Sequence, residues 1–285
     1  MRALYKRPGQ APQIEILPDP VPATGEVLLK PRMVGLCRTD LYVASELIWR
    51  PDPLILGHEF SAEVVDPNGS NFNKGDIVTV NPMYGKKFMG LHFNGALADL
   101  IAVPSNHVYL GDPTLADHLI AYAEPVAAAL ATSKLAITGK GAIYGENRIA
   151  ELSALVLRSR GIEVPILNEN APIPEDTYDF IIETVLRPAD GKKLCWGLKP
   201  NGTLILKSRK ADEVSFPVNL MVLKDITFKS VSYGEWSTVI PWIKSNKEKL
   251  IELVGPTFQF ADAIEAFNHA GNGEAKKTFI NICAE

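Results

Sequence analysis

Residues 141–168 ("GAIYGENRIAELSALVLRSRGIEVPILN") restrict the possible folds more than any other part of the chain. An apolar run, a turn with glycine, a helical pattern and a second apolar run follow one another here. A helix between two strands is typical of the unit that connects neighbouring parallel strands. The alternation continues through apolar runs at 178–185, 204–208 and 225–234. We therefore expect a parallel α/β sheet in this half of the chain.

The link after residue 168 is too short for the complete version of such a sheet. Only residues 169–177 ("ENAPIPEDT") separate Asn168 from the next apolar run, where a helix, a strand and a second helix belong. In the strand order 3-2-1-4-5-6, the third strand lies at the edge, so the remaining strands stay connected without it. We expect a shortened sheet that still folds, with its second strand exposed as an edge.

The first half of the chain has a different pattern. Short runs of alternating apolar residues, broken by proline, glycine and asparagine, predict a β-rich domain with many loops. The runs are 25–36, 60–66, 74–82 and 97–110. A helix at 237–254 and a helix followed by a strand at 260–282 complete the expected elements.

Charge and cysteine content exclude several classes of protein. The net charge is −4 and no run of Lys or Arg occurs, so binding to nucleic acid or to an anionic membrane has no electrostatic support. The longest apolar stretch, 119–137, is interrupted by charges and a proline, and residues 1–13 have no apolar core of a signal peptide. Three widely spaced cysteines indicate a reducing compartment, and we expect the cytoplasm.

Residues 54–66 ("LILGHEFSAEVVD") contain a His and a Glu inside an apolar strand pattern. Buried polar groups of this kind need partners. Side chains of adjacent residues in a strand point to opposite faces, so both reach one metal only if the backbone turns, as Gly57 permits. Together with Cys37, His58 and Glu59 form a set of zinc ligands that leaves a fourth position open. The alternative is a packed cysteine and a hydrogen-bonded histidine.

Several motifs in order resemble the zinc-containing medium-chain dehydrogenases of the alcohol dehydrogenase superfamily, closest to the sorbitol and threonine dehydrogenase branch. The motifs are 25–40 ("GEVLLKPRMVGLCRTD"), 53–65, 74–82, 95–104 and 123–130 ("AEPVAAAL"). The resemblance implies an α/β protein with a GroES-like β-rich catalytic domain at 1–130, completed by 256–285. It implies a truncated Rossmann-type parallel sheet domain at 131–255.

The resemblance also implies a catalytic zinc site held by Cys37 and His58, with Glu59 or Glu124 completing the shell. Zinc lowers the pKa of a bound alcohol, which allows an alkoxide to form near neutral pH. A second, structural zinc is not expected, because residues 81–100, which match the structural zinc lobe of the family, contain no cysteine.

Residues after the zinc cysteine have expected roles in proton transfer. Thr39 resembles the relay hydroxyl on the alkoxide, and Asp40 the carboxylate that orients the zinc histidine. Both residues could instead cap a helix that begins at Leu41. Tyr42 stands where related enzymes often have a proton-carrying histidine, and a phenol is a poorer relay at neutral pH.

The dinucleotide turn departs from the G-x-G-x-x-G pattern. Gly145 keeps the first position, Asn147 replaces the second glycine and Ala150 the third. Asn168 stands where an acidic residue would bind the adenosine ribose, and Glu146 adds like charge near the phosphates. NAD(H) is the expected cofactor, bound weakly. The resemblance implies that Arg38 matches an arginine that binds the cofactor pyrophosphate in some alcohol dehydrogenases. The alternative is that Arg38 only covers the protein surface with its alkyl chain.

The expected function is interconversion of a secondary alcohol of a polar, small-molecule substrate (a polyol, sugar or amino alcohol) and its ketone with NAD(H). A non-catalytic or nicotinamide-free zinc protein of the same descent is one alternative, and a zinc-free enoyl or quinone reductase is another. The strand at 225–234 resembles the one that pairs across a two-fold axis in these enzymes, so we expect a homodimer.

Overall fold

The computed structural model describes residues 1–208, 213–272 and 276–283. The chain divides into two compact units, Met1–Val126 with Trp236–Glu285 (unit 1) and Ala127–Glu235 (unit 2). Residues 236–255, expected in the nucleotide-binding domain, therefore belong to unit 1. Two contacts hold this segment in unit 1. Trp236 stacks on Tyr109 with ring centroids 5.4 Å apart, and Lys244 forms an ion pair with Asp112 at 2.6 Å.

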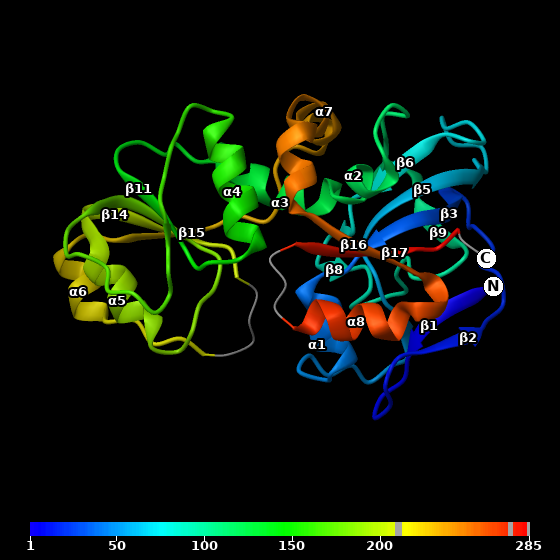
Figure 1. Cartoon of the computed structure of the whole chain (residues 1–285), viewed down its shortest axis with the longest axis horizontal. Coiled ribbons are helices and arrows are strands. Elements are labelled where there is room, and N and C mark those ends of the chain that lie inside the picture. Colours follow the sequence, from blue (N-terminus) through cyan, green and yellow to red (C-terminus); the bar gives the residue numbers. More distant parts are fainter. Residues whose placement is uncertain (209–212, 273–275, 284–285) are drawn as a thin grey trace. The chain divides into compact units, whose positions relative to one another are not determined.

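Unit 1 is built from β-strands with short helices between them (Figure 1). The strands are β1 (Arg2–Lys6), β2 (Gln13–Ile16), β3 (Glu26–Gly35), β4 (Leu54–Ile55), β5 (Glu59–Asp66), β6 (Ile77–Val80), β7 (Met83–Tyr84), β8 (Lys87–Phe88), β9 (Ile101–Pro104), β10 (Val108–Leu110), β16 (Val254–Gln259) and β17 (Lys277–Asn281). The helices are α1 (Arg38–Ala44), α2 (Asp117–Ala121), α3 (Ala123–Leu130, which continues into unit 2), α7 (Val239–Leu250) and α8 (Ala263–Gly271).

The main sheet of unit 1 has the order β10-β6-β5-β3-β17-β16, with β9 also paired to β3. Strand β3 lies between β5 and β17, and its last residue, Gly35, is opposite Glu59 on one side and Phe279 on the other. Alternate residues of β3 and β5, including Leu29, Val34 and Phe60, are buried in the core of the unit. This register brings the end of β3, the start of β5 and the start of β17 together.

Unit 2 contains, in its described residues, five parallel strands in the order β12-β11-β13-β14-β15. They are β11 (Gly141–Tyr144), β12 (Ile166–Leu167), β13 (Tyr178–Glu183), β14 (Leu198–Leu206) and β15 (Thr227–Ser230). The helices are α4 (Arg148–Arg158), α5 (Asp190–Gly197) and α6 (Val218–Leu223). The order equals 2-1-4-5-6 of the complete fold, so the prediction of a sheet without its third strand is confirmed.

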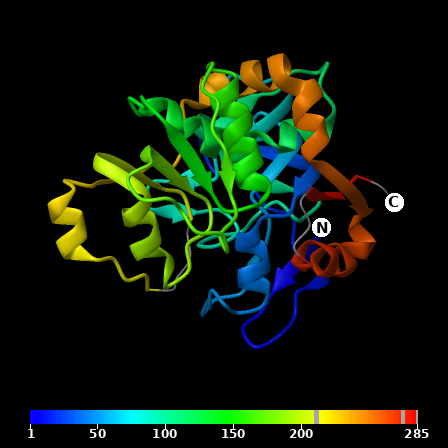
Figure 2. The same cartoon turned by 60° about the vertical axis from the view of Figure 1, so that its left-hand side comes forward.

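Helices cover both faces of this sheet (Figures 1 and 2). Helix α4 packs Ala154 and Leu157 against one face through Ile143, while α5 packs Leu194 against the other face through Tyr144. Adjacent side chains of β11 thus pack on opposite faces of the sheet. Because helices cover both faces, the whole strand is apolar. The carboxyl ends of β11, β12 and β13 meet at one edge of the sheet. Among the described residues, no helix is long and apolar enough to span a membrane.

Candidate metal centre

Three predicted ligands lie together in unit 1. Cys37 stands directly before α1, and His58 and Glu59 stand at the start of β5. One possible ligand atom from each of the three residues lies within 4.8 Å of the others. The pairing of Gly35 with Glu59 explains the proximity, because it holds the start of β5 beside the chain that leaves β3.

Gly57 makes the turn that precedes the two ligands. Its φ of 93° lies in the left-handed region that favours glycine. A Cβ at this position would also lie 2.9 Å from Leu97 Cγ and 3.0 Å from the Leu97 backbone nitrogen. Both the conformation and the close approach therefore require glycine directly before His58.

Asp40 fixes the environment of His58. Its buried carboxylate accepts hydrogen bonds from the Cys37 N–H at 2.9 Å and the Gly57 N–H at 3.0 Å. Asp40 Oδ1 lies 3.3 Å from His58 Nδ1, within ion-pair distance although without hydrogen-bond alignment. The edge of Phe88 contacts the imidazole, with ring centroids 4.8 Å apart. These contacts orient the ring and leave Nε2 as the nitrogen for a metal ion.

The two groups also stabilise each other's charge. Burial alone would raise the pKa of Asp40, but His58 and the two N–H groups hold that pKa below its usual range. Burial alone would lower the pKa of His58, yet Asp40 and Cys37 raise it well above the ordinary value. The surroundings of the imidazole are thus strongly negative, which favours a cation.

The helix after Cys37 begins earlier than predicted. Helix α1 starts at Arg38, not at Leu41, and Cys37 is its N-cap. Asp40 is the third helical residue and closes a capping box onto Cys37, so it both caps the helix and orients His58. Thr39 places its Oγ1 3.8 Å from Cys37 Sγ. Tyr42 is half-buried in the same helix, and no hydrogen bond of the described residues links its phenol to the ligands.

Lys277 is a member of the centre that the sequence analysis missed. Its side chain is 0% exposed, forms an ion pair with Glu59 and donates a hydrogen bond to the Leu36 carbonyl at 3.2 Å. The lysine lies over Gly35, where a Cβ would be 2.3 Å from Lys277 Cε. The available signal was weak: Lys277 starts the run 277–282 directly after Lys276, and a lysine is rarely buried without a partner.

Glu124 lies close to this group without being one of the three clustered ligands. It is buried on α3. Burial raises the pKa of Glu59, Lys277 opposes that rise, and the charge of Glu124 adds to it. Two carboxyl groups and one ammonium therefore lie in one buried region, where a divalent cation would favour the ionised carboxylates.

The predicted cofactor residues are divided between the two units. Arg38 directly follows Cys37 as the first residue of α1 in unit 1, and the others belong to unit 2. Gly145 has a φ of 108° in the turn after β11, Asn147 is the N-cap of α4, and Ala150 is buried in its first turn. Asn168 follows β12 at the neighbouring strand end. These four residues of unit 2 therefore follow the carboxyl ends of β11 and β12, and their role in cofactor binding stays a prediction.

Comparison with known proteins agrees with this arrangement. Residues 23–112 match the alcohol dehydrogenase GroES-like domain. The L-threonine 3-dehydrogenase of Saccharopolyspora erythraea is 23% identical over 342 residues, which cover 99% of each chain. The chain is thus similar along its whole length to a dehydrogenase, and its first part matches the alcohol dehydrogenase GroES-like domain. The alignment is longer than the 285 residues of this chain, so the relative has segments that this chain lacks.

Solved structures share the fold of this chain along its whole length. The 2R,3R-butanediol dehydrogenase from Bacillus subtilis has a TM-score of 0.85 at 19% identity, over 99% of both chains. A putative zinc-binding dehydrogenase from Sinorhizobium meliloti, bound to NADP, has a TM-score of 0.86 at 16% identity over 99% of both chains. These likenesses show the fold of the chain, and its reaction and substrate are separate questions.

Proposed function

We propose that this protein is a zinc-dependent oxidoreductase that interconverts a secondary alcohol of a polar substrate and its ketone, with NAD(H) as the hydride partner. The substrate class is a polyol, sugar or amino alcohol, in line with the threonine and butanediol dehydrogenases to which the chain is similar. The observation that supports the proposal most strongly is the cluster of half-buried Cys37 with buried His58 and Glu59.

The donor set fits zinc. A thiolate, an imidazole and a carboxylate are all zinc ligands, and three protein ligands leave a position for substrate. Cys37 and His58 would hold the ion, and Glu59 or Glu124 would complete the shell. Bound zinc would act as a Lewis acid on the substrate oxygen.

The chain's own residues then have separate roles. Asp40 orients the imidazole of His58, and the hydroxyl of Thr39, next to Cys37, would relay the proton of the substrate alcohol, accepting it while passing its own proton on towards solvent. Lys277 forms an ion pair with Glu59, so its ammonium would compete with a metal ion for that carboxylate. Tyr42 remains a proposed, weaker route for the proton towards solvent.

Metal analysis tests the zinc site. We expect about one zinc per chain, as an open catalytic site requires. Cys37→Ser should remove most of it, whereas Cys283→Ser, at an exposed cysteine, should not. Two zinc ions per chain, or full zinc content in Cys37→Ser, contradict the proposal.

Activity requires a second assay, because zinc alone does not define the reaction. A panel of polyols, sugars and amino alcohols with NAD+ should give absorbance at the NADH wavelength, and EDTA treatment should abolish it. If neither these alcohols with NAD+ nor the matching ketones with NADH are turned over, the proposed reaction is wrong and the second candidate function applies.

The second candidate is a zinc protein of this family that works without nicotinamide, as a lyase, an isomerase or a binding protein. One observation favours it: N–H groups in the turn where a dinucleotide fold binds phosphate already donate to side chains of Asn147 and Glu169. As the turn stands, it does not fit a pyrophosphate. The zinc-free reductase has less support, since it does not need the cluster at Cys37.

We also propose that the protein is a homodimer. Strand β15 pairs only with β14 among the described residues, so its other edge is open to a second copy. Helix α6, which precedes it, exposes Val218, Val222 and Leu223, each more than two-thirds accessible. The cysteines are free, which supports a reducing compartment, and we propose the cytoplasm.

A further inference from the structure

The turn between β11 and α4 is already filled by the chain's own acceptors. In dinucleotide folds, the pyrophosphate binds to backbone N–H groups at this helix N-terminus. Here the N–H groups of Ile149 and Ala150 donate to Asn147 Oδ1 at 3.0 and 3.2 Å. The N–H of Glu146 donates to Glu169 Oε2 at 3.0 Å. A carboxamide and a carboxylate thus hold donors that phosphate oxygens would use.

Both the oxygen and the nitrogen of the Asn147 carboxamide form hydrogen bonds within the protein. Besides accepting the two helix N–H groups, its Nδ2 donates to Thr184 Oγ1 at 2.8 Å, and Thr184 in turn donates to the Tyr144 carbonyl at 2.9 Å. The space around the turn is small, because a Cβ on Gly145 would lie 2.4 Å from Val185 Cγ1. The side chain of Asn147 is therefore a rigid part of the turn.

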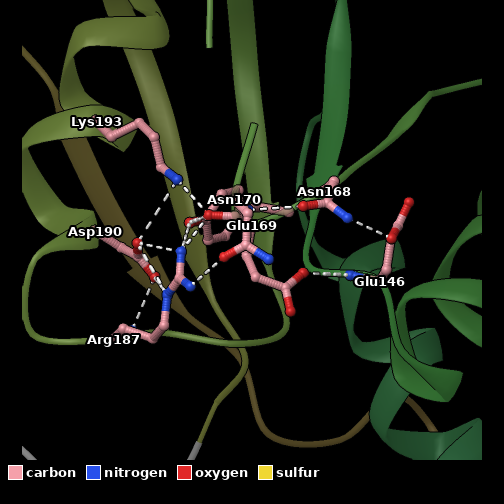
Figure 3. Close-up of polar contacts among 8 residues, drawn as sticks. Glu146, Asn168, Glu169, Asn170, Arg187, Asp190 and Lys193 are labelled. Carbon is pink, nitrogen blue, oxygen red and sulfur yellow. Dashed lines mark hydrogen bonds and ion pairs between the residues drawn. The ribbon is translucent and has the colours of Figure 1, made fainter. Parts of the chain in front are cut away.

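Glu169 is held beside the turn through its backbone. Its carbonyl accepts hydrogen bonds from Tyr144 Oη at 3.1 Å, from Lys193 Nζ at 2.6 Å and from the guanidinium of Arg187 (Figure 3). Arg187 is itself bound to Asp190, so the donors are fixed too. These contacts anchor the residue at the end of β12 with its carboxylate directed at Glu146, as Figure 3 shows.

The charges around the turn also oppose the binding of a phosphate group. The N–H of Glu146 lowers the pKa of Glu169, against the smaller opposing effect of burial, so this carboxylate is ionised at neutral pH. Asn168, expected at the ribose, instead donates to Glu146 Oε2 at 2.6 Å (Figure 3). Two carboxylates, those of Glu146 and Glu169, therefore flank the position of a doubly charged pyrophosphate.

We propose that the carboxylate of Glu169, assisted by the carboxamide of Asn147, occupies the phosphate position of this turn and thereby sets the affinity for the dinucleotide. The inference rests on the proposed use of NAD(H). A dinucleotide binds through the turn only after Glu169 has left the Glu146 N–H. The pairing of β12 with β11 makes this possible, because it sets Leu167 opposite Tyr144 and brings Glu169, two residues later, beside the turn that follows β11.

Calorimetric titration of the zinc-loaded protein with NADH tests the proposal. Glu169→Gln keeps the shape and the backbone anchor but removes the charge, and should tighten NADH binding about tenfold, the size of one charge-assisted contact. Asn147→Gly places glycine at the second motif position. Combined with Glu169→Gln, it should tighten NADH binding further than Glu169→Gln alone. Glu175→Gln removes an exposed acid from the same link and should leave affinity unchanged.

The outcomes separate this inference from the proposed function. Weaker binding by Glu169→Gln overturns the inference, because the carboxylate then contacts the ribose of the cofactor. Equal binding by wild type and Glu169→Gln also overturns it, while the proposed reaction stands. If none of the variants binds NADH, both the inference and the role of NAD(H) fall. Thermal unfolding and the amide resonance of Glu146 show that each variant is folded and that the contact has been released.

Discussion

Replacement of Lys277 by methionine tests the electrostatics of the metal centre most directly. Methionine retains most of the apolar volume but removes the ammonium from Glu59, whose side chain is 3% exposed. Removal of one partner from a buried ion pair costs about 3–5 kcal/mol, because the other charge is left uncompensated. Since domains are stable by only ~5–15 kcal/mol, the metal-free variant should unfold at a much lower urea concentration.

The matched control is Lys199→Met. Lys199 pairs with Asp179 at 2.9 Å, but both side chains are more than one-third exposed, so we expect a loss of less than about 1 kcal/mol. The double variant Lys277→Met with Glu59→Gln removes both charges and should recover part of the loss. Zinc supplies another positive charge, so the destabilisation by Lys277→Met should be smaller in the zinc-loaded protein.

Two results would refute this reasoning. The first is a loss for Lys277→Met no larger than that for Lys199→Met, which would show that Glu59 is not charged or not buried in solution. The second is a double variant whose destabilisation equals the sum of the two single variants, because the two groups would then not interact.

The remaining predictions concern assembly, thiol reactivity and the cofactor. Sedimentation at micromolar concentration should show a dimer, and Val222→Glu on the exposed face of α6 should shift it to monomer; a wild-type monomer contradicts the proposal. Burial raises the pKa of the Cys195 thiol to about 11, so iodoacetamide at pH 8 should modify exposed Cys283 quickly and Cys195 only after unfolding, as read by mass spectrometry. Arg38→Ala should weaken NADH binding at least about tenfold in calorimetry, as expected for a lost contact to a phosphate; unchanged affinity means that the guanidinium does not bind it.

The sequence predicted the shortened sheet because strand order depends on connectivity, and a link of only 169–177 leaves no room for a third strand. It predicted the ligand trio because residue types and order carry that information. It did not reveal Lys277, because the pairing of β17 with β3 joins segments far apart in the chain. It also directed attention to Asn168 alone, whereas the structure brings both Asn168 and Glu169 to Glu146 in the turn, because the chain bends after β12 ends at Leu167.

The ion pair of Glu59 and Lys277 also has a consequence for protein synthesis. Lys277 lies 241 residues after Leu36, whose carbonyl it binds. At about 5–20 residues per second, Leu36 leaves the ribosome roughly 12 to 48 s before the lysine that pairs with Glu59, and Cys37 and His58 follow Leu36 closely. During that interval, β3 also lacks β17 as a neighbour. The complete metal centre therefore forms only in chains that have been translated beyond residue 277, and a prematurely terminated chain carries an uncompensated carboxylate at the place where zinc would bind.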